Sequence, residues 1–111
     1  MDAVHKAVRE AFKIPANDKN IRLIAHEPHR FTCSPDRTTP ALYTQITIDA
    51  FAGRSLEAKR NLYEGIVNVL EPLGIPKDHV LTLIREAPTS YWGVLGGQAA
   101  CDLDLGFKID V

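Results

Sequence analysis

The sequence has few cysteines, no long apolar run and no excess of charge of either sign. Its two cysteines, Cys33 and Cys101, form no CxxC or Cys/His pattern, so we expect reduced thiols, or at most one distant pair. No apolar run approaches the roughly 20 residues of a membrane span. A formal net charge of −1 lacks the basic excess of a nucleic-acid-binding domain. We therefore expect neither a membrane nor a nucleic-acid partner.

The start of the sequence also lacks a targeting signal. Met1 is followed at once by Asp2, without the basic and apolar segments of a secretory leader, so we expect a cytoplasmic protein. The 111 residues, 45% hydrophobic and 24% charged, are typical of one soluble globular domain.

Apolar periodicity predicts two helices and three strands. The first helix is "MDAVHKAVREAF" (1–12), which ends before Pro15. The second begins after the N-cap candidate Ser55, with Glu57 in its first turn, and ends before Gly74. The predicted strands are "IRLIAHEP" (21–28), "LYTQITIDA" (42–50) and "HVLTLIREAP" (79–88).

One pattern occurs twice, about 60 residues apart. "REAFKIPANDKNIRLIAHEP" and "VLEPLGIPKDHVLTLIREAP" both run from a helix through Ile-Pro and an Asp to a strand, a Glu and a Pro. The second copy also has a leading strand, which makes it a βαβ unit with parallel strands. The first copy lacks that strand. We expect either about 10–15 residues of strand and loop ahead of it, or a domain that exists without them.

The sequence resembles the tautomerase superfamily, especially its malonate semialdehyde decarboxylase-like members. The resemblance rests on "AFKIPANDK", "ITIDAFAGRSLEAKRNLYEGI" and "IREAPTSYWGVLGG". It implies an α/β fold of two βαβ-type repeats, with a mixed four-stranded sheet and two helices on one face. A single tautomerase-like domain would span residues 1–111. It would comprise the first repeat without its leading strand (1–40), the second repeat (41–97) and a C-terminal tail (98–111), which in such families often packs on a neighbouring subunit.

The resemblance also implies a chemistry. The family's general base is an amino-terminal proline, whose secondary amine is neutral near pH 7 in an apolar pocket. The sequence begins with Met1 and Asp2, and its seven prolines are internal. Their nitrogens are amides without a basic lone pair. The resemblance thus implies the family scaffold, with the base expected on the missing leading strand.

Four residues are candidate site residues. The resemblance places Arg54 as a carboxylate-binding and catalytic residue, and a planar guanidinium suits that task; a solvated loop arginine is the alternative. It places Asp18 as a catalytic carboxylate that orients water or substrate; a turn-forming Asp is the alternative. Trp92 and Val94 would form an apolar pocket wall, or serve packing alone. No metal site is expected, since His26 and His29 lie near the end of a predicted strand, where alternation would place them on opposite faces.

The leading functional hypothesis is cofactor-independent proton transfer on a small carboxylated keto/enol or unsaturated acid. Decarboxylation and hydration use the same scaffold and stay open. One alternative is an oligomeric binding or scaffold protein that has lost the base. Another is a hetero-oligomer whose second subunit supplies the proline. One sheet face is left without helices, and the resemblance implies that a homotrimer covers it.

Overall fold

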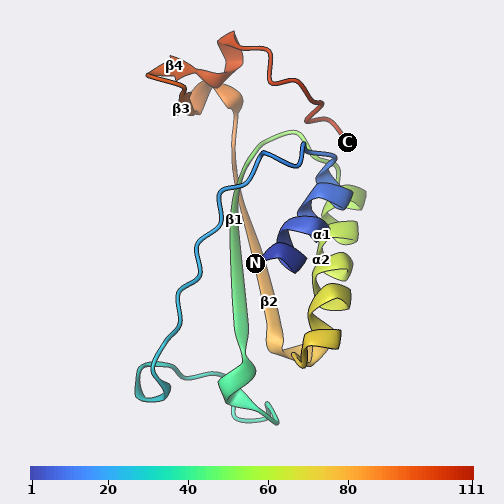
Figure 1. Cartoon of the computed structure of the whole chain (residues 1–111), viewed down its shortest axis with the longest axis vertical. Helices are drawn as coiled ribbons and strands as arrows, with labels where there is room; N and C mark the ends of the chain where they lie inside the picture. Colours follow the sequence, from blue (N-terminus) through green and yellow to red (C-terminus); the bar gives the residue numbers. More distant parts are fainter.

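The computed structural model describes residues 1–111 and contains one helical layer packed on one face of a small sheet (Figure 1). In chain order the elements are α1 (Asp2–Phe12), β1 (Thr44–Phe51), α2 (Leu56–Leu70), β2 (Val80–Ala87), β3 (Gly93–Val94) and β4 (Gln98–Ala99). Short 3-10 turns span Pro28–Arg30, Pro40–Leu42, Glu71–Leu73, Lys77–His79, Thr89–Tyr91 and Ala100–Asp102.

The predicted helix boundaries are confirmed by their capping geometry. α1 ends at Phe12, and its C-cap residue Lys13 adopts a left-handed conformation (φ 55°) two residues before Pro15. α2 begins after Ser55, whose hydroxyl accepts a hydrogen bond from the Ala58 N–H at 3.1 Å. After the 3-10 turn that extends α2, Gly74 reverses the chain at φ 96°, a conformation that glycine adopts without a Cβ clash.

The second repeat is a βαβ unit, as the sequence predicts. β1 and β2 are parallel over their full length, from Thr44 opposite Val80 to Phe51 opposite Ala87. α2 connects them and packs on the sheet beside α1. This connection places the carboxyl end of β1 next to the amino end of α2.

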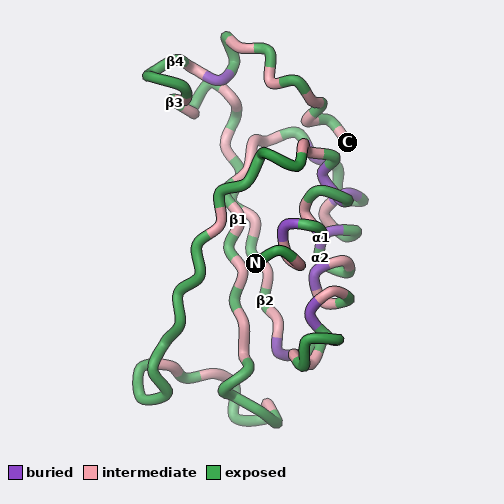
Figure 2. The backbone as a smooth tube through the Cα atoms, viewed as in Figure 1, coloured by how far each residue is buried: buried purple, intermediate pink, exposed green.

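The core lies between the two helices and the sheet. Leu62 and Ile66 of α2 are completely buried, and Phe12 of α1 is 2% exposed. Ile46 and Ile48 of β1 pack against this cluster with their alternate side chains. Figure 2 shows the buried residues mainly along the helices and none on β1 or β2. The sheet is thus covered on one face only.

The predicted strand at residues 21–28 is wrong for this structure. Residues 21–27 have no regular secondary structure, and Leu23 and Ile24 are 77% and 73% exposed. An extended segment becomes a strand only when a neighbouring strand pairs with its backbone, and β1 pairs only with β2. The expected four-stranded sheet is therefore a parallel pair plus a separate antiparallel pair, β3–β4.

The uncovered face of the sheet combines apolar and charged side chains. Leu81 and Leu83 are 48% and 49% exposed there. Next to them Arg85 donates two hydrogen bonds to the Asp49 carboxylate, at 2.8 and 2.9 Å. These hydrogen bonds raise the pKa of Arg85. Neither helix is long and apolar enough to cross a membrane.

We predict that Leu62→Ala lowers the free energy of unfolding by about 3 kcal/mol, since a fully buried leucine leaves a cavity when it is truncated. Leu73→Ala, at a side chain that is 68% exposed, is the matched control and should change it by less than about 0.5 kcal/mol. Urea unfolding followed by circular dichroism measures both. Equal effects of the two variants would contradict the position of the core.

Candidate functional site

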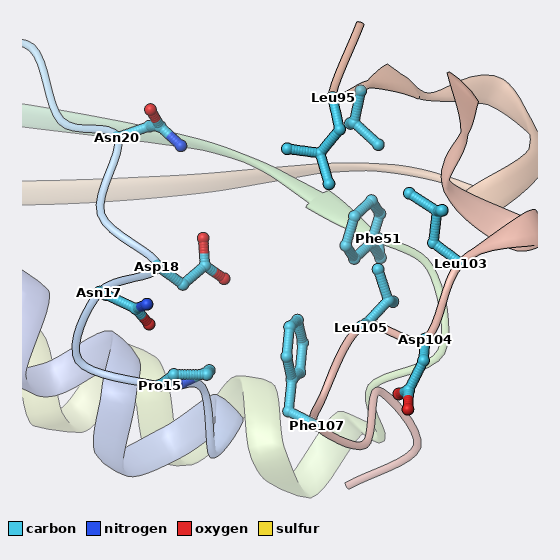
Figure 3. Close-up of a pocket in the computed structure, with 11 residues that line it drawn as sticks. Pro15, Asn17, Asp18, Asn20, Phe51, Leu95, Leu103, Asp104, Leu105 and Phe107 are labelled. Carbon is cyan, nitrogen blue, oxygen red and sulfur yellow. The ribbon is translucent and has the colours of Figure 1, made fainter. Parts of the chain in front are cut away.

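A cavity of about 470 Å³ lies at the carboxyl end of β1 (Figure 3). The loop after α1, the β3–β4 hairpin and the C-terminal tail meet there, and in α/β proteins this end of the strands commonly binds ligands. The lining residues are Pro15, Asn17, Asp18, Asn20, Phe51, Val94, Leu95, Leu103, Asp104, Leu105 and Phe107. A smaller depression of about 290 Å³ on the outer side of α1 contains none of the predicted site residues.

Asp18 lies on the loop after α1 and points into the cavity (Figure 3). Its N–H donates to the Pro15 carbonyl at 3.1 Å, which closes a tight turn. The Asp18 carbonyl lies 3.1 Å from Nε2 of the buried His5. Because a carbonyl only accepts, His5 must be protonated at Nε2. A Lys19–Asp2 ion pair of 3.1 Å also holds the loop on α1.

Arg54 lies on the connection from β1 to α2 and is only 8% exposed. Its Nη1 donates to the Phe51 carbonyl at 3.1 Å, and its guanidinium lies 4.8 Å from the centre of the Phe12 ring, a favourable cation–π distance. It does not line the cavity. Asp18 therefore lies on the cavity surface, whereas Arg54 is bonded to the backbone of the lining residue Phe51.

Arg54 is a buried cation with an unused hydrogen-bond donor. Its Nε has no partner, and it forms no ion pair. Burial lowers the pKa of Arg54, and the charges of Asp18 and Glu86 partly raise it again. Glu86 itself pairs with Lys59. A buried charge is usually paired, so an anion that reached Arg54 would supply the missing partner.

Val94 lines the cavity, whereas Trp92 lies behind it. The Trp92 indole N–H donates to the Ala87 carbonyl at 3.1 Å, which ties the hairpin to the end of β2. The Trp92 ring packs edge-on against Phe51, with 4.9 Å between ring centres. The structure thus brings Asp18 and Val94 to the cavity itself. It places Arg54 and Trp92 in a supporting layer that contacts Phe51.

Several residues that line the cavity were not predicted from the sequence. Among them are Phe51 and the tail residues Leu103, Leu105 and Phe107. Phe51 is the last residue of β1, a position that could have identified it. The tail has a weaker signal, an alternation of apolar and other residues from 103 to 111. No group of three or more His, Cys, Asp or Glu side chains is arranged to hold a metal ion.

We predict that His5→Ala speeds hydrogen exchange at the Asp18 amide about five- to tenfold, because the lost hydrogen bond loosens the loop. His5→Gln, which keeps a donor near the Nε2 position, should restore most of the protection. Lys6→Ala, on the exposed side of α1, is the control. Exchange that is unchanged in His5→Ala would show that His5 does not hold the loop.

Known proteins similar to this chain point to one family. A family model described as tautomerase enzyme matches residues 18–94, a range that includes all four predicted site residues. A probable tautomerase of Ralstonia nicotianae is 35% identical over 52 residues, which cover 46% of this chain and 74% of that protein.

Two solved structures share the architecture. The crystal structures of a malonate semialdehyde decarboxylase, studied for decarboxylase and hydratase activities, are 27% identical with a TM-score of 0.74. They cover 93% of this chain, and the match takes in 84% of theirs. A fused 4-OT, solved as an asymmetric trimer, superposes with a TM-score of 0.78 at 24% identity, over 91% of this chain and 81% of its own.

The likeness to the fused 4-OT concerns the fold alone. The family model, in contrast, covers more than two thirds of the sequence. The chain therefore belongs to the tautomerase superfamily.

Proposed function

We propose that this protein catalyses cofactor-independent proton transfer, a keto–enol tautomerisation or a related decarboxylation or hydration, on a small carboxylated substrate. The observation that supports this most is the buried Arg54 guanidinium, which has an unused donor and no ion-pair partner beside a cavity. Arg54 does not itself line the cavity, so a lining side chain must move before a substrate carboxylate can reach that donor and form a charge-assisted hydrogen bond. The similarity to a malonate semialdehyde decarboxylase points in the same direction.

Asp18 is the proposed second participant. Its carboxylate faces the cavity, so it can orient a water molecule or a substrate hydroxyl for proton transfer. The charge of Asp18 also raises the pKa of Arg54 against the effect of burial. Asp18 thus favours the charged guanidinium without occupying its Nε donor.

The proposed general base is an amino-terminal proline on the leading strand that the repeat predicts. The apolar side of the cavity, with Phe51, Leu105 and Phe107, would favour the neutral form of such an amine. β1 has one unpaired edge, and segment 20–27 runs along it on the side away from β2 in Figure 1. The related decarboxylase was also studied as a variant in which alanine replaces the proline at position 1.

We further propose a homotrimer. The uncovered sheet face exposes Leu81 and Leu83, and an apolar sheet face is stable when another layer covers it. The similar fused 4-OT is a trimer. Three copies that face each other through these sheets would bury the two leucines.

Arg54→Gln should lower kcat/KM for a 2-oxo acid about 10- to 100-fold, because the charge-assisted hydrogen bonds to the carboxylate are lost. Arg54→Lys keeps the charge but loses the planar fork, so its kcat/KM should lie between those of the wild type and of Arg54→Gln. Arg60→Gln, at an exposed arginine of α2, is the matched control. Loss of enol absorbance measures turnover, and circular dichroism checks folding. Carboxylate binding without turnover would favour the binding-protein alternative.

We predict that the protein purified from its own cells begins with proline and assembles as three identical subunits. Denaturing mass spectrometry with amino-terminal sequencing measures the first property, and native mass spectrometry of the same sample measures the second. A chain of 12.3 kDa that begins at Met1 or Asp2 would remove the proposed base. A second kind of subunit that begins with proline would place the base in a hetero-oligomer.

A further inference from the structure

A pair of opposite charges bridges α2 and β2 close to Arg54. Lys59 of α2 and Glu86 of β2 form an ion pair, and their side chains are only 24% and 25% exposed. Neither residue lines the cavity. The Lys59 N–H also donates to the Ser55 carbonyl at 3.1 Å, so Lys59 lies one turn into α2, just after the connection that carries Arg54. The proposed reaction gives this ion pair no role.

Glu86 interacts with two cations but contacts only one of them. Its charge raises the pKa of Arg54 against the effect of burial, which places the two groups close enough to interact. Arg54 nevertheless forms no ion pair, and its Nε has no hydrogen-bond partner. A partly buried carboxylate normally keeps a cationic partner. Lys59 therefore occupies the one carboxylate of β2 that could otherwise pair with Arg54.

The two cations differ in how freely they can turn. The Arg54 guanidinium is held by the Phe51 carbonyl, 3.1 Å from Nη1, and by the Phe12 ring at 4.8 Å. An ammonium is instead a compact charge on a flexible four-carbon stem, and the Lys59 stem reaches from α2 to the sheet. Lys59 can thus follow the Glu86 carboxylate, whereas Arg54 keeps an orientation that does not depend on Glu86.

We propose that Lys59 is a positioning residue: it holds the Glu86 carboxylate away from Arg54 and so keeps the Arg54 Nε donor free for a substrate carboxylate. The role of Arg54 in this inference rests on the proposed function. Without Lys59, Glu86 would have no partner, and the Arg54 guanidinium already attracts it. The Glu86 carboxylate would then pair with Arg54, use its free donor and repel a substrate carboxylate.

Lys59→Met, which keeps a long side chain without its charge, tests the first part of the proposal. NMR of the full, isotopically labelled chain measures the exchange of the Arg54 Nε proton with water. That exchange should slow about tenfold or more in Lys59→Met, because a hydrogen bond between charged groups forms. Glu86→Gln added to Lys59→Met should restore the wild-type rate. Lys59→Arg, which can still pair with Glu86, should leave the rate unchanged.

Arg60→Met is the matched control. Arg60 is also a cation of α2, but its side chain is 66% exposed and its partner, 4.0 Å away, is Glu57 of the same helix. Its loss should leave the exchange of the Arg54 Nε proton unchanged. Circular dichroism verifies that every variant folds, and Lys59→Gln takes the place of Lys59→Met if the latter does not fold.

Isothermal titration calorimetry with butanoate, an unreactive monocarboxylate, tests the second part. Lys59→Met should raise the Kd about tenfold or more, whereas Glu86→Gln should not raise it. In the Glu86→Gln background, Lys59→Met should change the Kd by less than about twofold, since no freed carboxylate competes for Arg54. A purely structural ion pair would behave differently, because both single variants break it and would weaken binding alike.

Unchanged exchange of the Arg54 Nε proton in Lys59→Met would overturn the proposal. Where butanoate binds better than butanamide, equal effects of Lys59→Met on the butanoate Kd with and without Glu86→Gln would overturn it as well, because Lys59 would then act through its own charge.

Butanamide separates the inference from the proposed function. If the exchange depends on Lys59 as expected but butanoate binds no better than butanamide, Lys59 positions Glu86 and Arg54 does not bind carboxylates. A preference for butanoate, with proton exchange that does not depend on Lys59, would contradict the role of Lys59 and leave that of Arg54 standing.

Discussion

The apolar contact between α2 and the parallel β1–β2 pair is the interaction on which the rest of the molecule depends. Leu62 and Ile66 are completely buried in it, and Ile46 and Ile48 contact the same cluster from the sheet. Because α2 connects two parallel strands, its amino end must lie beside the carboxyl end of β1. This constraint brings the Gly53–Ser55 connection and the cavity to one end of the sheet.

The site also depends on the burial of the Arg54 charge at the carboxyl end of β1. Arg54 is held by the Phe51 carbonyl and the Phe12 ring, and neither contact neutralises it. The charge of Asp18 offsets part of the burial effect on the Arg54 pKa. Phe51 links the two layers of the site, since its ring lines the cavity and also packs on Trp92. The site therefore consists of the residues that line the cavity and of Arg54 and Trp92, which contact the lining residue Phe51.

The same fold leaves surfaces uncovered. No residue of β1 or β2 is fully buried, because helices cover only one face of the sheet, and β1 has an unpaired edge. The similar fused 4-OT is a trimer. The proposed trimer would cover the open sheet face, and the proposed leading strand would pair with the open edge. Each would bury surface or backbone groups that this single chain leaves exposed.

The sequence by itself determined the local structure: α1, β1, α2 and β2 follow from apolar periodicity, and their ends follow from Ser55, Gly74 and Pro15, because these signals act over a few residues. It also indicated the superfamily and the place of Asp18. Only the tertiary structure decided that residues 21–27 do not form a strand, because strand formation requires a partner. It likewise decided that Arg54 is buried against the Phe12 ring, and that Phe51 and Phe107, 56 residues apart in the chain, line the same cavity. Such positions depend on packing between distant segments, which no local pattern specifies.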